Sequence, residues 1–370
     1  MAELNKVCII GNNGNGQLVS DGGRIKIRIY KELLLNIGID SYIVDLDGWK
    51  SHILRTIKKI KNAIKARHVI LIMAGPKGSR ALIPIVNYLN RKIKTRVVFC
   101  PLGIGTLEKK IKHLSSEQVT DFLNCKNTFG IKDIKMKKEL TKLDLIFPQN
   151  EVLGNCYRKF YGLENVSVLN NFRNIDIVKK DYNLSGQISL IFISRVCVEK
   201  GIFDLIETVK EINNDGDKVK LSIYGDIQLN EIEQKEFFSN LSDNIQYLGV
   251  ANNEDSVEIL RKYDLFVLPT KYVGEGTPGS LIEAFLSGTP ALISSYSQAN
   301  LLVTDSLNGF IFEINNKESL KKKIIEIYSN KEVLEKIGLE AQKEAIKYTF
   351  KYNKNSFVNC IMGERQWKFY

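Results

Sequence analysis

The sequence predicts an α/β protein with two doubly wound domains. Short apolar runs of strand length alternate with longer stretches in which apolar residues recur at helical spacing, and this alternation occurs twice along the chain. Such repetition builds parallel sheets with helices on both faces. The 370 residues, of which 44% are hydrophobic and 26% charged, are enough for two buried cores.

The strand candidates fall into two sets, separated by a polar linker at 170–186. We therefore expect one domain at residues 1–172, a second at 173–350, and a C-terminal helical segment at 351–370. The first set of strands is expected at 6–10, 41–46, 68–74, 95–100, 144–147 and 166–169, and the second at 187–193, 219–224, 245–248, 264–268, 290–293 and 309–312.

Two carboxylates lie eight positions apart around a predicted loop-to-helix junction. Glu275 is in the loop after the apolar run 265–268, and Glu283 is past the first helical turn. The amides near 278–281 can bind a phosphate, because a helix start has unpaired N–H groups and the positive end of the dipole. The alternative is a solvated loop acid and an ordinary helix residue. The substrate contacts expected on this segment are Gly276, Thr277, Pro278, Gly279, Ser280, Leu281 and Glu283.

Two basic residues follow the first strand of the second domain. Arg195 stands at the end of the apolar run 188–193, and Lys200 stands just before the next helical stretch. A planar guanidinium and a compact ammonium together suit the neutralisation of a diphosphate leaving group. Alone, each would be read as a surface charge. In combination with the two acids about 75 positions on, they favour a nucleotide-sugar site.

In these residues the chain resembles the family 4 retaining glycosyltransferases of the GT-B fold, whose signature is Glu, seven residues, Glu, preceded by an Arg and a Lys. The resemblance covers roughly 187–313. It implies two Rossmann-like domains with a cleft between them, and a C-terminal helix that packs back on the first domain. It also implies transfer of a sugar from a nucleotide-sugar to a glycan or lipid-linked acceptor with retention of configuration, as in the assembly of cell-surface polysaccharides.

The resemblance also assigns roles. Glu275 would hold a donor-sugar hydroxyl, Glu283 would hold the ribose hydroxyls, and Arg195 and Lys200 would stabilise the departing diphosphate. Neither a metal ion nor any other cofactor is required. Relatives often carry a His near the donor sugar, for which His113 is a weak match in its lysine-rich stretch.

Glycines gather after the first predicted strand. The spacing is not that of a Rossmann dinucleotide fingerprint, so we expect a loop that lines the cleft, with an ordinary turn as the alternative. The residues expected to approach the substrate there are Gly14, Gly16, Gly22 and Gly23. Asp45-Leu46-Asp47 looks like a metal-binding Asp-x-Asp, but the charge a metal would bring is already supplied by Arg195 and Lys200.

Charge is unevenly distributed. Residues 1–180 carry a net charge of +17 and residues 181–370 a net charge of −6. Residues 51–100 hold twelve basic groups and no acid, and several of them share a predicted helix with Ile53, Ile57, Ile60 and Ile64. Such a helix can lie on an anionic membrane, or it can be the solvated face of a sheet-covering helix. Nucleic acid is disfavoured because no recognition motif accompanies the charge.

The remaining expectations concern location and alternative activities. The chain enters a strand at once and has no apolar run long enough to span a bilayer, so we expect a cytoplasmic protein, peripheral at the inner face of the membrane. Six scattered Cys and three His without ligand spacing favour reduced thiols and disfavour zinc. A sugar-nucleotide epimerase or a non-catalytic sugar-nucleotide-binding subunit stays open as an alternative.

Overall fold

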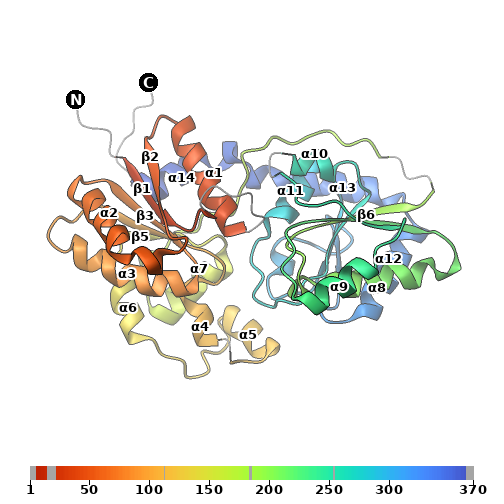
Figure 1. The fold of residues 1–370 in the computed structure, drawn as a ribbon, viewed down its shortest axis with the longest axis horizontal. Helices are drawn as coiled ribbons and strands as arrows, with labels where there is room; N and C mark the ends of the chain where they lie inside the picture. The colour runs from red at the N-terminus through yellow and green to blue at the C-terminus, as the bar shows by residue number, and fades with distance from the viewer. Residues whose placement is uncertain (1–5, 15–21, 112, 183–185, 253–254, 364–370) are drawn as a thin grey trace. The chain divides into compact units, whose positions relative to one another are not determined.

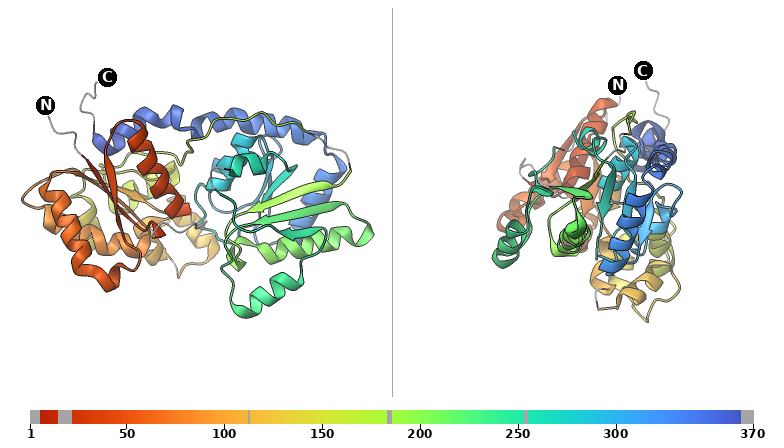
Figure 2. Two further views of the ribbon diagram at one scale, coloured as in Figure 1. Left: turned by 45° about the horizontal axis from the view of Figure 1, so that its top comes forward. Right: turned by 90° about the vertical axis from the view of Figure 1, so that its right-hand side faces the viewer.

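The computed structural model describes residues 6–14, 22–111, 113–182, 186–252 and 255–363. The chain divides into two compact units, one of Met1–Asn174 with Phe350–Tyr370 and one of Ile175–Thr349. The boundaries expected from the sequence are 172 and 350. Each unit has its own parallel sheet and its own core, with helices on both faces of the sheet (Figures 1 and 2).

The sheet of the first unit has five parallel strands in the order β2-β1-β3-β4-β5. β1 lies between β2 and β3, with Val7 opposite both Ser41 and Val69. The chain therefore changes direction across the sheet between β1 and β3. The strands are β1 (Val7–Gly11), β2 (Ser41–Asp45), β3 (Val69–Ala74), β4 (Val97–Pro101) and β5 (Leu145–Ile146).

Two layers of helices bury this sheet. Apolar residues of α1 and α14 pack on one face, and those of α2, α3 and α7 pack on the other. The helices are α1 (Gly22–Asn36), α2 (Ile53–Lys65), α3 (Pro76–Asn90), α4 (Glu108–Ile111), α5 (Ser116–Leu123), α6 (Ile134–Leu140), α7 (Glu151–Tyr161) and α14 (Phe350–Met362).

The C-terminal helix α14 belongs to the core of the first unit. Its Phe357 ring lies 4.8 Å from the ring of Tyr30 and 5.7 Å from that of Phe172, both edge to face. The guanidinium of Arg96 donates to the carbonyl of Ile361 at 2.8 Å. The terminal aromatic residues Trp367 and Phe369 lie outside the described residues.

The sheet of the second unit has six parallel strands in the order β11-β10-β9-β6-β7-β8. After β6 the chain builds outward through β7 and β8, then returns to the other side of β6 for β9, β10 and β11. Eleven of the twelve expected strands are thereby found. The strands are β6 (Ile188–Ile193), β7 (Val219–Tyr224), β8 (Ile245–Tyr247), β9 (Leu265–Leu268), β10 (Ala291–Ser294) and β11 (Phe310–Phe312).

Helices again cover both faces. Those packed on one face are α8 (Ile202–Ile212), α9 (Glu231–Ser239) and α12 (Lys317–Ser329), and those on the other are α10 (Ser256–Leu260) and α11 (Gly279–Ser287). α13 (Val333–Ala345) contributes to both cores. Short 3-10 turns are η2 (Trp49–His52), η3 (Gly105–Leu107), η4 (Val198–Lys200), η5 (Asn213–Asp215), η6 (Ala299–Leu301) and η7 (Ile346–Tyr348).

One expected strand is wrong. The apolar run 166–169 makes only a single bridge, between Val166 and Ile146. Two amides of the run donate to the neighbouring chain, that of Ser167 to the carbonyl of Ile146 and that of Leu169 to the carbonyl of Pro148, each at 3.0 Å. Pro148 has no N–H to donate in return, so the pairing is interrupted there and the run is not a regular strand.

The predicted linker packs against the second unit. The Lys180 ammonium donates to the carbonyls of Arg261 and Tyr263, each at 2.6 Å, and burial lowers the pKa of Lys180 to about 8. The Tyr182 hydroxyl donates to the carbonyl of Gly288 at 2.6 Å. This segment is therefore part of the second unit rather than a free connection.

Gly201 allows the turn after β6 to touch the end of β9. Its backbone is left-handed (φ +74°), and a Cβ at this position would lie 2.0 Å from the carbonyl oxygen of Pro269. No side chain fits both conditions. Gly201 therefore fixes how closely η4, and with it Lys200, approaches the loop after β9.

We predict that Gly201→Ala destabilises the second unit far more than Gly249→Ala does. Gly249 has nearly the same backbone angle (φ +80°), but a Cβ added there would meet no atom within 4 Å, so it measures the cost of the left-handed backbone alone. That cost is about 1–2 kcal/mol, and the clash with Pro269 adds to it at Gly201. Urea unfolding of both variants checks this, and equal losses would contradict it.

Candidate active site

The carboxyl ends of β6 and β9 flank the point where the second sheet reverses its strand order. Ligands of doubly wound sheets bind at such a point, beyond the carboxyl ends of the strands. Lys200 follows β6 and Glu275 follows β9, and these two strands are hydrogen-bonded neighbours. The fold therefore places the predicted ammonium and the predicted carboxylate at one switch point.

Lys200 and Glu275 form an ion pair between Nζ and Oε2. Their side chains are only 10% and 13% exposed, so most of the surrounding water has been removed. Removing one member of such a pair leaves the other charge uncompensated, which typically costs about 3–5 kcal/mol. The two residues consequently depend on each other in the folded protein.

A third side chain joins this pair. The Thr270 hydroxyl lies 3.2 Å from the same Oε2 of Glu275, and Thr270 is fully buried just after β9. The carbonyl of Thr270 accepts a hydrogen bond from the Ser294 hydroxyl at 2.6 Å, at the end of β10. Glu275 is thus held by groups from the ends of neighbouring strands.

The loop after β10 also contacts the Glu275 loop. The Ser297 hydroxyl donates to the carbonyl of Val273 at 2.6 Å. Tyr296 is buried, and its hydroxyl has no hydrogen-bond partner among the described residues. Burial, and secondarily the Glu275 carboxylate, raise the pKa of Tyr296 well above its usual value, so its hydroxyl stays protonated.

The N-terminus of α11 follows the Glu275 loop. Pro278 caps the helix in an extended conformation, and the helix begins at Gly279. Thr277 is buried, whereas Gly276, Gly279 and Ser280 are partly exposed. The side chain of Leu281 lies in the core, so any substrate contact there comes from its amide. Glu283 is buried in the helix, 7% exposed.

Arg195 is directed to a different neighbour. Its guanidinium donates to the side-chain oxygen of Gln228 at 3.2 Å, and Gln228 donates to Asp226 at 3.0 Å. Both partners belong to the loop after β7, on the opposite side of β6 from Glu275. The structure therefore brings Lys200 together with Glu275, while Arg195 is hydrogen-bonded on the β7 side of the switch point.

The glycine loop of the first unit also follows a strand at a switch point, here between β1 and β3. Gly14 has a left-handed backbone (φ +69°), and Gly22 and Gly23 begin α1. Gly16 lies outside the described residues. The exposed His113 lies in a turn.

The carboxylate of Asp45 shapes this loop. Its Oδ1 accepts hydrogen bonds from the amides of Asn13, at 2.8 Å, and Asp47, at 2.9 Å. The first Asp of the Asp-x-Asp sequence thus has a structural role, which is to stabilise a turn. Among the described residues, no group of three or more His, Cys, Asp or Glu side chains is placed to hold a metal ion.

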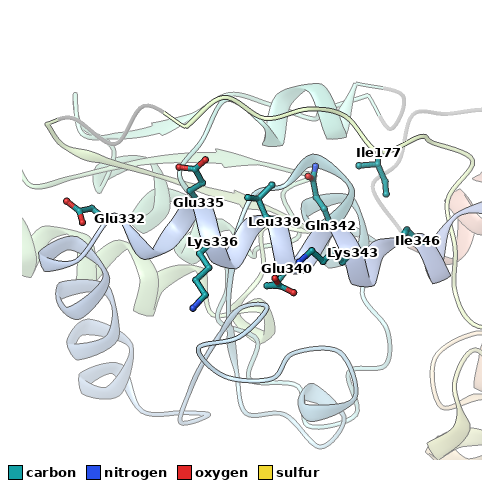
Figure 3. Close-up of a pocket in the computed structure, with 9 residues that line it drawn as sticks. All are labelled: Ile177, Glu332, Glu335, Lys336, Leu339, Glu340, Gln342, Lys343 and Ile346. Atoms are coloured by element: carbon teal, nitrogen blue, oxygen red, sulfur yellow. Dashed lines mark hydrogen bonds and ion pairs between the residues drawn. The ribbon is translucent and has the colours of Figure 1, made fainter.

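An open hollow of about 630 Å³ runs along α13 (Figure 3). Both acidic and basic side chains line it, and its apolar members Ile177, Leu339 and Ile346 are 39%, 47% and 52% exposed. None of the predicted site residues lines it. It therefore has no part in the site at the switch point.

Sequence reasoning missed Thr270, Tyr296 and Gln228. The position of Thr270 in the sequence could have indicated its role. It follows a buried strand and Pro269, so it lies at the carboxyl end of that strand. Tyr296 has a comparable position two residues after β10. Nothing local distinguishes Gln228, whose contact with Arg195 spans 33 positions.

Residues 174–344 match the family model described as glycosyl transferases group 1. The chain is 29% identical over 187 residues to an uncharacterized glycosyltransferase of Methanocaldococcus jannaschii, covering 50% of this chain and 48% of the relative. It is 26% identical over 325 residues to the poly(ribitol-phosphate) alpha-N-acetylglucosaminyltransferase of Staphylococcus aureus, covering 83% and 63%. The chain thus spans about half to two thirds of these relatives.

The fold is also similar to that of solved structures. HepE of Anabaena, in complex with UDP and glucose, superposes with a TM-score of 0.70 at 15% identity, over 95% of this chain and 98% of HepE. This confirms the predicted fold class, two doubly wound domains of the GT-B type. The region matched by the glycosyl transferases group 1 model covers the second unit almost completely.

Proposed function

We propose that the protein is a glycosyltransferase that moves a sugar from a nucleotide-sugar donor to a glycan or lipid-linked acceptor with retention of configuration. The observation that carries the proposal is the Lys200–Glu275 pair at the switch point of the region matched by the group 1 model. Diphosphate esters suit this position, since an ammonium and the start of α11 are both near it. UDP-sugars are the first donors to test, because HepE binds UDP.

The reaction breaks the bond between the sugar C1 and the diphosphate oxygen and forms a bond from C1 to an acceptor oxygen. For retention, the acceptor attacks the face that the diphosphate leaves, and the departing phosphate oxygen takes the acceptor proton. No carboxylate nucleophile is required. The protein contributes by stabilising the charge that develops on the leaving group and by holding the sugar in position.

The proposed roles divide among the site residues. Lys200 and Arg195 approach the diphosphate from the two sides of β6, and the first amides of α11 add partial positive charge. Glu275 accepts a hydrogen bond from a sugar hydroxyl, and Glu283 accepts from the ribose. Because Lys200 is already paired with Glu275, donor binding must share its three N–H donors between carboxylate and phosphate.

The first test is release of UDP from UDP-sugars, followed by mass spectrometry. We expect the wild-type protein to release UDP, and Glu275→Gln and Arg195→Ala to slow this by about 10² or more, as for loss of a contact to transition-state charge. Gln at 275 keeps an oxygen that accepts from Lys200, which limits the loss of stability.

Matched controls are Glu258→Gln and Arg261→Ala, which break an exposed pair 2.8 Å apart at the C-terminal end of α10. Their rates should stay within a few-fold of wild type. A Glu275 or Arg195 variant at the wild-type rate would remove that residue from the site. Isomerisation of the sugar without release of UDP would indicate an epimerase instead, and binding alone would indicate a non-catalytic subunit.

We predict that turnover does not require a divalent metal ion. The charge of the departing diphosphate is met by Lys200, Arg195 and the start of α11, so EDTA should leave the rate nearly unchanged. The measurement is UDP release before and after chelation. Complete loss with EDTA and recovery with Mn²⁺ would return Asp45 and Asp47 to consideration as ligands.

We propose that the first unit also holds the protein at an anionic membrane surface. Among the described residues, no helix is both long and apolar enough to cross a bilayer. The apolar face of α2 is not available to lipid, because Ile60 and Ile64 pack in the core. Its basic face is exposed, and Ile53 and Leu54 at its start are 41% and 81% exposed.

Replacement of Lys58, Lys59 and Lys61 by Glu should weaken sedimentation with anionic vesicles. Each basic group near such a surface contributes about 1 kcal/mol at low salt, and wild-type binding should fall as salt rises. A triple variant of Lys220, Lys235 and Lys322, exposed lysines of the second unit, makes the same change in net charge and serves as the control. Absence of wild-type binding at low salt would favour a soluble acceptor.

A further inference from the structure

We infer that Thr270 is a positioning residue for Glu275. Its hydroxyl, together with Lys200, fixes one carboxylate oxygen inside the protein and leaves the other to bind the donor sugar. The effect of Thr270 on turnover rests on the proposed function. The hydrogen bond between Thr270 and Glu275 does not rest on it and can be tested separately.

The two carboxylate oxygens of Glu275 are in different surroundings. Oε2 receives both Lys200 Nζ and the Thr270 hydroxyl, the latter at 3.2 Å. No described residue donates to Oε1. Since a carboxylate has about four acceptor positions, a sugar hydroxyl can bind Oε1 without displacing either internal donor.

The single proton of the Thr270 hydroxyl has two possible acceptors. Glu275 Oε2 lies 3.2 Å away and the carbonyl of Glu199 lies 3.3 Å away. The carboxylate is charged, and hydrogen bonds to charged acceptors are about twice as strong as those to neutral ones. The amide of Tyr272 donates to the Thr270 oxygen at 3.3 Å, which uses one of its lone pairs. The proton is therefore best directed to Glu275.

Thr270 is itself rigidly held. It is fully buried, and its carbonyl accepts from Ser294 at 2.6 Å. The next amide, that of Lys271, donates to the carbonyl of Glu199 at 2.8 Å. The hydroxyl thus projects from a backbone that is attached to β9, to the end of β10 and to the η4 turn, which suits a group that must orient another.

The role of Thr270 becomes larger when a diphosphate binds. Lys200 then divides its charge between Glu275 and the phosphates, and the bond from Thr270 keeps Oε2 in place. Without the hydroxyl, the carboxylate is held only by the group that the leaving group attracts. The loss should therefore fall on kcat, while the donor KM changes little because the diphosphate contacts remain.

The test compares Thr270→Val and Thr270→Ser in steady-state kinetics with the UDP-sugar that the wild-type protein turns over. Val removes the hydroxyl at nearly constant volume and should lower kcat about ten- to a hundredfold, as for a lost hydrogen bond to a charged group. Ser restores the hydroxyl and should recover most of kcat. A Val variant with wild-type kcat, or a Ser variant no better than Val, would overturn the inference.

Thr289→Val is the matched control. Thr289 is also a fully buried Thr of the second unit, and its hydroxyl donates to the carbonyl of Leu260 at 2.8 Å, away from Glu275. It should lose stability but retain kcat. If Thr289→Val lowered kcat as much as Thr270→Val does, the effect of both would be structural and the positioning role would fail.

A wild-type protein that turns over no UDP-sugar would contradict the proposed function but not the contact. A double-mutant cycle in urea decides the contact without any activity. The lowering of the unfolding midpoint by Thr270→Val should be smaller when Glu275 is already Ala, because the acceptor is gone, whereas Thr289→Val should add independently. Equal effects of Thr270→Val in the two backgrounds would overturn the inference.

Discussion

The second unit depends on one ion pair, Lys200 with Glu275. Both side chains are nearly buried, and neither charge is stable there without the other. The pair joins loops that are 75 positions apart in the chain and follow adjacent strands. The Thr270 hydroxyl contacts the same oxygen of Glu275. Gly201 permits the close approach of these two loops, because an added Cβ there would lie 2.0 Å from the carbonyl oxygen of Pro269.

For the diphosphate ligand that we propose, the pair supplies a cation without making the site strongly positive on its own. In the ligand-free protein the charge of Lys200 is largely neutralised by Glu275, so the cost of burying it is limited. Arg195 is hydrogen-bonded to the neutral side chain of Gln228 and is less buried. The two cations thus differ in burial: Lys200 is buried and paired with Glu275, whereas Arg195 is more exposed.

Most of the strands and the candidate acidic residues could be predicted from the sequence, because strand-length apolar runs and the spacing of Glu275 and Glu283 are local signals. The error at 166–169 has a physical cause, since the run lies beside the end of β5 but Pro148 there has no N–H to continue the ladder. The bond from Thr270 to Glu275 could not be predicted, because it depends on the conformation of the intervening loop. Nor could the contact of Arg195 with Gln228, which requires the register of β6 and β7.

The surroundings of helix α2 also could not be predicted from the sequence alone. The sequence left open whether its isoleucines face lipid or a sheet, and burial of Ile60 and Ile64 in the core decides for the sheet. What remains outside is charge, with Ile53 and Leu54 at one end. Attraction of this kind is weakened by salt and is independent of the Lys200–Glu275 pair. The proposed binding to a surface and the proposed chemistry on a sugar therefore belong to different units, and separate mutations can test them.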